Sequence, residues 1–238
     1  AKYVALIAKT YESDIMDEIY GIIPVSKFND AKSRLSPFLR EEEREELLKV
    51  MLKDVTDSLR KHVDKIIIIS ADSDVLNYAK SINLDTLVEN DNSNLNQALK
   101  QAMDYCKGKT KKVIIIPSDV PLIGKTNINL LIESSKSLDF VIVPSKGGGT
   151  NAIILKPSAI RTRFGEFSYK EHVNAASRKK LNPQVHDSFF MALDGNTPED
   201  LGEIMVHGEN TNTRKYLKQL KINVESIHGH ERLKVTRG

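Results

Sequence analysis

The stretch that decides the fold is VIIIPSDVPLIG, residues 113–124. Its first four residues are apolar and β-branched, which is typical of a strand buried on both faces of a sheet. Pro117 ends such a strand because proline has no N–H to donate to a neighbouring strand. Ser118 and Asp119 therefore follow the carboxyl end of a buried strand, the edge at which open α/β sheets bind their ligands. A carboxylate there can hold a hard cation such as Mg²⁺; alternatively, Asp119 caps a turn.

Strands and helices alternate on both sides of this stretch. Further strands are predicted over residues 21–25, 65–69, 86–88, 140–144 and 152–155. Helices are predicted over residues 41–61, 73–81 and 128–137, after the N-cap Asn94, and after the N-cap Ser168 with Glu171 in a capping box. This alternation predicts a three-layer α/β/α fold with helices on both faces of the sheet.

No internal repeat or break in composition divides the chain, so residues 1–238 are predicted to form one domain. Residues 1–18 are expected to form an N-terminal extension, in which residues 4–8 could be a strand and the acidic residues 10–19 a short helix. Residues 209–238 are expected to be a C-terminal tail that holds a helix and two short strands whose position the sequence leaves open.

Composition narrows the classes of function. Lys and Arg total 35 and Asp and Glu total 32, so the net charge of +3 is too small to indicate nucleic-acid binding. The single cysteine, Cys106, excludes an internal disulfide framework and fits a reducing compartment, so we expect a cytoplasmic protein. No apolar run approaches the roughly 20 residues of a membrane span. Neither nucleic acid nor a membrane is therefore expected as a partner.

A basic segment, SKFNDAKSRLSPFL (residues 26–39), follows the first predicted strand. It contains Lys27, Lys32, Ser33 and Arg34. Three cations directly after a buried strand can neutralise a polyphosphate. Alternatively, the segment is an ordinary solvated loop.

Polar side chains and glycines mark two further candidate positions. Asn96 is expected in the first turn of the helix that Asn94 caps, where it could contact a base or ribose or could only support the cap. Gly147, Gly148 and Gly149 precede Thr150 between two predicted strands. A backbone without β-carbons can approach a ligand closely, which favours a binding loop over a flexible hairpin tip.

A second acidic position lies near the end of the chain. Asp194 and Asn196 precede Thr197-Pro198, a strong helix start. Asp119 and Asp194 each follow a strand-like segment, so both can reach the same edge of one sheet and share a metal ion. The sequence has neither a P-loop nor a Gly-x-Gly-x-x-Gly motif, which argues against a P-loop kinase or a dehydrogenase.

Six segments together resemble the 2-phospholactate guanylyltransferases of coenzyme F420 biosynthesis and the related phosphoenolpyruvate guanylyltransferases. They are IIPVSKFNDAKSRLS, LNQAL, PSDVPLI, KGGGTNAIIL, FGEFSYKEH and DGNTPEDL, within residues 20–208. The resemblance implies a GT-A-like, Rossmann-like nucleotidyltransferase fold with a mostly parallel mixed sheet. It also implies transfer of GMP from GTP to 2-phospholactate or phosphoenolpyruvate, with release of pyrophosphate.

The resemblance also implies site residues and partners. The catalytic residues would be Lys27, Lys32, Arg34 and Asp119. The nucleotide would be bound by Lys27, Lys32, Ser33, Arg34, Asn96 and Ser118. The small phosphorylated carboxylic acid would be bound by Thr150, Gly165 and Ser168. Mg²⁺, the implied cofactor, would be held by Asp119 and Asp194. The sequence itself leaves the oligomeric state open, and the C-terminal tail is a candidate interface of a homodimer.

The chain departs from the family pattern at Asn196, where the family commonly has a second acid; an amide oxygen can still ligate Mg²⁺. Two alternatives stay open. One is a nucleotidyltransferase of the same fold whose acceptor is a sugar phosphate, a molybdopterin or a polyol phosphate. The other is a non-catalytic nucleotide-binding domain.

Overall fold

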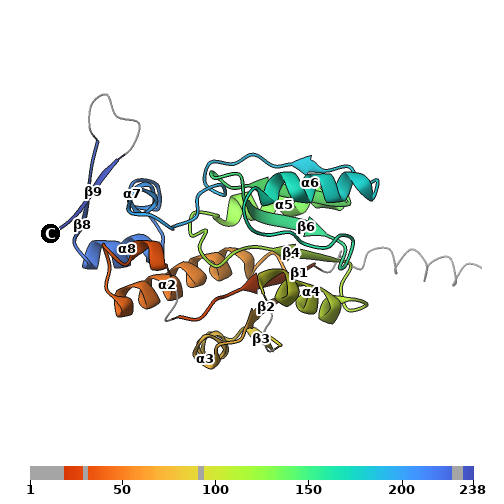
Figure 1. Cartoon of the computed structure of the whole chain (residues 1–238), viewed down its shortest axis with the longest axis horizontal. Helices are drawn as coiled ribbons and strands as arrows, with labels where there is room; N and C mark the ends of the chain where they lie inside the picture. The colour runs from red at the N-terminus through yellow and green to blue at the C-terminus, as the bar shows by residue number, and fades with distance from the viewer. Residues whose placement is uncertain (1–18, 29–31, 91–93, 227–232) are drawn as a thin grey trace, which may run out of the picture.

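A computed structural model describes residues 19–28, 32–90, 94–226 and 233–238. The predicted extension, residues 1–18, lies outside the described residues. The centre is a seven-stranded sheet in the order β3-β2-β1-β4-β6-β5-β7 (Figure 1). Its strands are β1 (Ile19–Pro24), β2 (Lys65–Ser70), β3 (Asp85–Val88), β4 (Lys112–Ile115), β5 (Phe140–Pro144), β6 (Thr150–Leu155) and β7 (Gln184–Val185).

The sheet is mixed and mostly parallel, as the sequence predicts. Strand β1 pairs in parallel with β2 and β4, β2 pairs in parallel with β3, and β5 pairs in parallel with β7. Strand β6 is antiparallel to both of its neighbours, β4 and β5. Because β6 returns from β5 by a short connection, no crossover helix is needed there.

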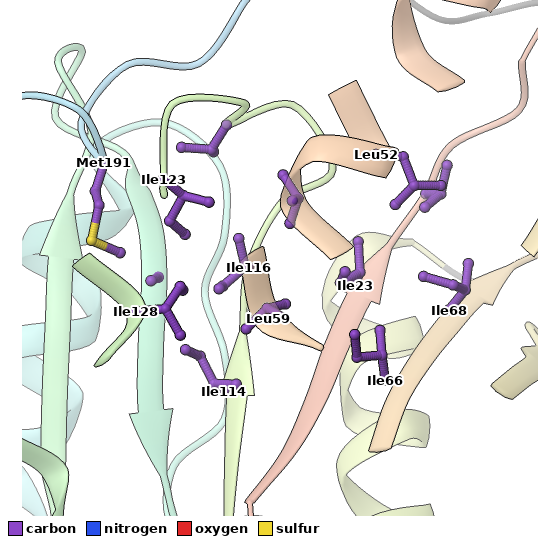
Figure 2. Packing of buried hydrophobic residues seen from close by; sticks show 14 of the residues in the cluster. Ile23, Leu52, Leu59, Ile66, Ile68, Ile114, Ile116, Ile123, Ile128 and Met191 are labelled. Carbon is purple, nitrogen blue, oxygen red and sulfur yellow. The ribbon is translucent and has the colours of Figure 1, made fainter. Parts of the chain in front are cut away.

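Helices cover both faces of the sheet, which confirms the predicted three layers. One face packs on α2 (Glu41–Leu59), α3 (Ser73–Ser81) and α5 (Lys125–Lys136), and the other on α4 (Leu95–Cys106) and α6 (Ser168–Arg178). The alternation of side chains along each strand produces this division. Ile23 and Ile68 join the first core, which Figure 2 shows, whereas Ile22 and Ile67 join the second.

A third apolar cluster lies beside this sandwich. It includes residues of the short 3-10 helix η1 (Ser33–Leu35), of α2, and of α7 (Pro198–His207) and α8 (Asn212–Gln219). The two tail strands, β8 (Ile222–Glu225) and β9 (Lys234–Arg237), pair antiparallel with each other. Figure 1 shows this small sheet beside α7 and α8, away from the main sheet.

Several local predictions are confirmed. Asn94 caps α4 in a capping box with Gln97, and Thr197 caps α7 with Pro198 at its start. Cys106 is fully buried in the core, and burial raises the pKa of its thiol to about 11. It packs as a small apolar residue. Among the described residues, no helix combines the length and the apolar character needed to cross a bilayer.

Three local predictions are wrong. Ser168 is not the N-cap of α6; that position belongs to Phe167, which adopts a left-handed conformation with φ of 51°. The Ser168 hydroxyl instead points to the Thr150 hydroxyl, at 3.2 Å. The strand predicted over residues 152–155 begins two residues earlier, because β6 starts at Thr150. Helix α5 also begins three residues earlier than predicted, at Lys125.

Candidate active site

The candidate site lies where the chain changes direction across the sheet. From β1 the chain moves outward to β2 and β3, and it then returns to the other side of β1 as β4. Ligands of open α/β sheets bind at such switch points, outside the carboxyl ends of the strands. A cavity of about 350 Å³ opens there. It is lined by Pro24, Val25, Ser26, Ile69, Glu89, Leu95, Ala98, Ile115, Pro117, Ser118, Asp119 and Phe164.

Lys32 is the basic residue that the fold brings to Asp119. Its backbone adopts a left-handed conformation, with φ of 54°, and η1 begins at the next residue. The Lys32 side chain is only 5% exposed and forms an ion pair with the Asp119 carboxylate. Its Nζ atom also donates to Asn196 Oδ1 at 3.0 Å. Lys32 therefore joins the basic segment to both acidic stretches that the sequence singled out.

Asp194 completes this group of oxygens. The Asn196 amide donates to the Asp194 carboxylate, and the Gly195 N–H donates to the backbone oxygen of Asp119 at 2.9 Å. Burial raises the pKa of Asp194, and the nearby charge of Asp119 raises it further. The two acidic segments thus meet as predicted, although Asp194 follows a turn at residues 189–192 and not a strand. The ammonium group of Lys32 lies where it compensates their charge.

The oxygens of this group fit a magnesium ion in kind. Mg²⁺ prefers carboxylate and carbonyl oxygens and commonly uses one or two carboxylates, with water and substrate phosphates as further ligands. Asp119, Asp194 and the Asn196 amide oxygen are donors of this kind. Within the described ranges, no group of three His, Cys, Asp or Glu side chains could hold a metal ion by itself. A bound cation would therefore need oxygens from the substrate or solvent.

The other predicted nucleotide residues lie in different surroundings. Lys27, Ser33 and Arg34 are exposed, and Ser118 is buried in the wall of the cavity. The Asn96 side chain bonds to the backbone of Phe164 on both sides: Nδ2 donates to the carbonyl at 2.9 Å, and Oδ1 accepts from the N–H at 2.8 Å. Asn96 thus fixes Phe164, a cavity-lining residue that sequence reasoning missed.

The three residues predicted to bind the acid, Thr150, Gly165 and Ser168, lie close together in space. Ser168 bonds to the Thr150 hydroxyl and to the Gly165 carbonyl, each at 3.2 Å. Thr150 is 4% exposed and Ser168 1% exposed, and both take part in a buried network with His172. Gly165 adopts φ of +136°, a conformation that only glycine takes easily, and a β-carbon there would meet no other atom within 4 Å. Backbone conformation, not space, therefore favours glycine at this position.

Solved structures define the class to which this fold belongs. A candidate nucleotide-diphospho-sugar transferase from Desulfovibrio desulfuricans G20 has a TM-score of 0.72 at 18% identity, over 86% of this chain and 95% of that one. A 4-diphosphocytidyl-2C-methyl-D-erythritol synthase from Anaerococcus prevotii has a TM-score of 0.54 at 11% identity, over 85% of this chain and 99% of that one. A Mycobacterium tuberculosis protein in complex with manganese has a TM-score of 0.50 at 13% identity, over 77% of this chain and 92% of that one. The fold is that of the nucleotide-diphospho-sugar transferases, which agrees with the GT-A-like nucleotidyltransferase fold that the resemblance implies.

Sequence comparison defines the family. A model of the guanylyl transferases described as CofC like matches residues 19–238, and the chain belongs to this family. It is thus a nucleotidyltransferase, as the sequence predicts. The 2-phospho-L-lactate guanylyltransferase of Methanobrevibacter smithii is 81% identical over 223 residues, which are 94% of this chain and 100% of the relative. That of Methanobrevibacter ruminantium is 60% identical over 233 residues, 93% and 100% of the two chains.

Proposed function

We propose that this enzyme transfers GMP from GTP to 2-phospho-L-lactate and releases pyrophosphate. A phosphate oxygen of the acid attacks the α-phosphorus of GTP, and the bond from that phosphorus to the oxygen bridging to the β-phosphate breaks. The observation that carries the proposal is the buried contact between Lys32 and Asp119 beside the cavity at the switch point. The similarity to the Methanobrevibacter relatives supports 2-phospho-L-lactate as the acceptor.

Charge stabilisation is the main task of the residues in this reaction. Lys27, Lys32 and Arg34 would place positive charge along the triphosphate and the leaving pyrophosphate. No general base is required, because a phosphate monoester is largely ionised at neutral pH. This agrees with the surroundings of His172, which is fully buried and holds two hydrogen bonds inside the protein.

Asp119 and Asp194 are proposed to hold the metal ion, with the Asn196 amide oxygen as a further donor. When bound, a divalent cation such as Mg²⁺ neutralises phosphate charge and polarises phosphoryl oxygens. The ammonium group of Lys32 between Asp119 and Asn196 supports this role, because it shows that the oxygens favour a cation. The manganese in the Mycobacterium tuberculosis relative is consistent with a divalent ion in this fold.

The remaining residues are assigned to the nucleoside, the phosphates and the acid by their position around the cavity. Ser118, in the wall of the cavity, and Asn96, at the start of α4, would lie beside the nucleoside, and Ser33 would lie beside the phosphates. Thr150, Gly165 and Ser168 would contact the acid. These assignments are supported by the place of the residues in loops or near the starts of helices and strands around the sheet edge, where α/β folds bind their ligands.

The test is pyrophosphate release with Mg²⁺ and GTP, with 2-phospho-L-lactate, phosphoenolpyruvate or 3-phosphoglycerate as the acceptor. We expect release with 2-phospho-L-lactate and much slower release with the other two acids. Release with another acid alone would change the acceptor and keep the guanylyl transfer. No release with any acid, and none with CTP or ATP, would contradict the proposal and favour a non-catalytic nucleotide-binding domain.

A further inference from the structure

His172 is a buried residue whose two ring nitrogens both have a partner. The N–H of Arg163 donates to Nε2 at 2.8 Å, and Nδ1 lies 3.0 Å from Thr150 Oγ1. A backbone N–H can only donate, so Nε2 must be the unprotonated nitrogen of the ring. Nδ1 then carries the proton of the neutral ring and donates it to Thr150. Burial and the nearby charge of Arg163 lower the pKa of His172 to about 4, which keeps the ring neutral.

This tautomer sets the direction of the hydrogen bonds at Thr150 and Ser168. Their hydroxyl oxygens are 3.2 Å apart, and the Thr150 oxygen already accepts from His172. Of the two hydroxyl protons, one is used between the pair, whichever residue donates it. The other is left to donate outside this chain of bonds. Because carboxylate and ionised phosphate oxygens only accept, a pair with a proton to donate suits an anionic ligand.

The same imidazole also holds one wall of the cavity. Its Nε2 bonds the residue before Phe164, and the two rings meet edge to face, with centroids 4.8 Å apart. Asn96 holds the backbone of Phe164 from the other side, through its N–H and its carbonyl. Phe164 in turn lines the cavity. His172 is therefore bonded both to the Thr150–Ser168 pair and to the segment that presents Phe164.

We propose that His172 is a positioning residue with two separable effects. Its Nε2 atom holds the segment that presents Phe164 to the nucleotide. Its Nδ1–H bonds to the Thr150 oxygen and orients the Thr150–Ser168 pair, so that the remaining hydroxyl proton is donated to the acid. This inference rests on the proposed function, which places GTP in the cavity and the acid at Thr150 and Ser168.

Two variants separate the two bonds. In His172→Gln, the amide oxygen can take the place of Nε2 and accept from Arg163, but the donor to Thr150 is lost. In His172→Asn, the shorter amide can donate to Thr150 in place of Nδ1, but the bond from Arg163 is lost. We expect His172→Gln to raise KM for the acid about tenfold and to change KM for GTP less than about twofold. We expect His172→Asn to raise KM for GTP about tenfold and to change KM for the acid less than about twofold.

His207→Gln and His207→Asn are the matched controls, because His207 lies on α7 against Phe189 and Phe190, outside the cavity lining. In both control variants, KM for the acid and KM for GTP should equal those of the wild type. Melting temperatures are measured for all variants. If both His172 variants raise the two KM values by the same factor, His172 has only a structural role and the proposal is wrong.

A second measurement keeps this test independent of turnover. The ¹⁵N spectrum of labelled histidine should show His172 protonated at Nδ1, and a proton at Nε2 would overturn the proposal. If the wild-type enzyme releases no pyrophosphate with any acid, the proposed function fails on its own. Calorimetry then decides the inference: His172→Asn should bind GTP about tenfold more weakly and His172→Gln should bind it as the wild type does, while equal binding by both would overturn it.

Discussion

Lys32 and Asp119 are 87 positions apart in the sequence, and their side chains form an ion pair in which the lysine is almost completely buried. Burying a charge costs free energy unless an opposite charge compensates it, so the Asp119 carboxylate is needed to keep the Lys32 ammonium group buried. The ammonium group also donates to Asn196, which continues the contact to the Asp194 turn. The contact therefore fixes three loops around one point of the sheet edge.

Replacing Asp119 with Asn tests the role of its charge. The amide has almost the same size and can still accept a hydrogen bond from Lys32, but it leaves the buried ammonium without this counter-charge, so we expect a loss of stability of about 3–5 kcal/mol. Turnover should fall about 10²–10³-fold, because the charge proposed to hold the cation, and through it the phosphates, is removed. Pyrophosphate release with Mg²⁺ measures the rate, and urea unfolding measures the stability. A rate close to that of the wild type would show that Asp119 holds no catalytic metal.

Replacing Lys32 with Ala tests whether its ammonium group occupies the place of a cation. Without the lysine, Asp119 and Asp194 lose their compensating charge, so we expect Mn²⁺ to bind about tenfold more tightly in the absence of nucleotide. Titration calorimetry measures this affinity without any turnover. Lys27→Ala is the control, because Lys27 is exposed, and its Mn²⁺ affinity should match that of the wild type. Unchanged or weaker binding in Lys32→Ala would contradict the prediction.

The sequence predicts well the site residues that directly follow a strand, because the strands themselves are easy to recognise. The β-branched run before Pro117 fixes β4, and the apolar run before Pro24 fixes β1, so the residues that follow both strands must meet at one edge. Asp119 could therefore be placed beside the basic segment. Which of its cations reaches the carboxylate could not, because it depends on a left-handed backbone at Lys32, a conformation that lysine seldom adopts.

The segments around Thr150 and Ser168 were harder to predict because their contact with each other overrides local signals. Ser168 and Glu171 have the spacing of a capping box, yet the Ser168 hydroxyl bonds to Thr150 and the N-cap passes to Phe167. The tail strands posed a different difficulty. Their partners are each other and the helices α7 and α8, and their short sequences contain no signal for that position.

Glu43 holds the small tail sheet to α2. Its carboxylate accepts from Arg237 of β9 at 2.7 and 2.5 Å, and these bonds with those from Arg40 lower the pKa of Glu43 to about 2. The Glu43 side chain is 6% exposed, so we expect Glu43→Gln to lower the free energy of unfolding by about 2 kcal/mol. Urea unfolding checks the value.

Matched arginine variants show which partner matters. Arg237→Ala removes both short bonds to Glu43 and should lower the urea midpoint and speed hydrogen exchange in β8 and β9. Arg40→Ala is the control, because the Arg40 side chain is 74% exposed and such surface pairs contribute little. Equal effects of the two variants would show that Glu43 anchors only the start of α2.

His172 should make the protein sensitive to mild acid. Its pKa is about 4 in the folded protein and about 6.5 in an unfolded chain, so between these values the unfolded chain binds the extra proton. Stability from the neutral, buried ring is complete above pH 6.5 and is lost as the pH falls towards 4. The loss amounts to about 3 kcal/mol over this range.

The difference between wild type and His172→Gln isolates this effect from the other groups that titrate in the same range. Urea unfolding of both proteins at several pH values between 7.5 and 4 should show the wild type losing more stability than the variant as the pH falls. A difference that stays constant with pH would mean that the ring can take up a proton without leaving its site. That result would be incompatible with the bond from Arg163, because a protonated Nε2 has no lone pair with which to accept that N–H.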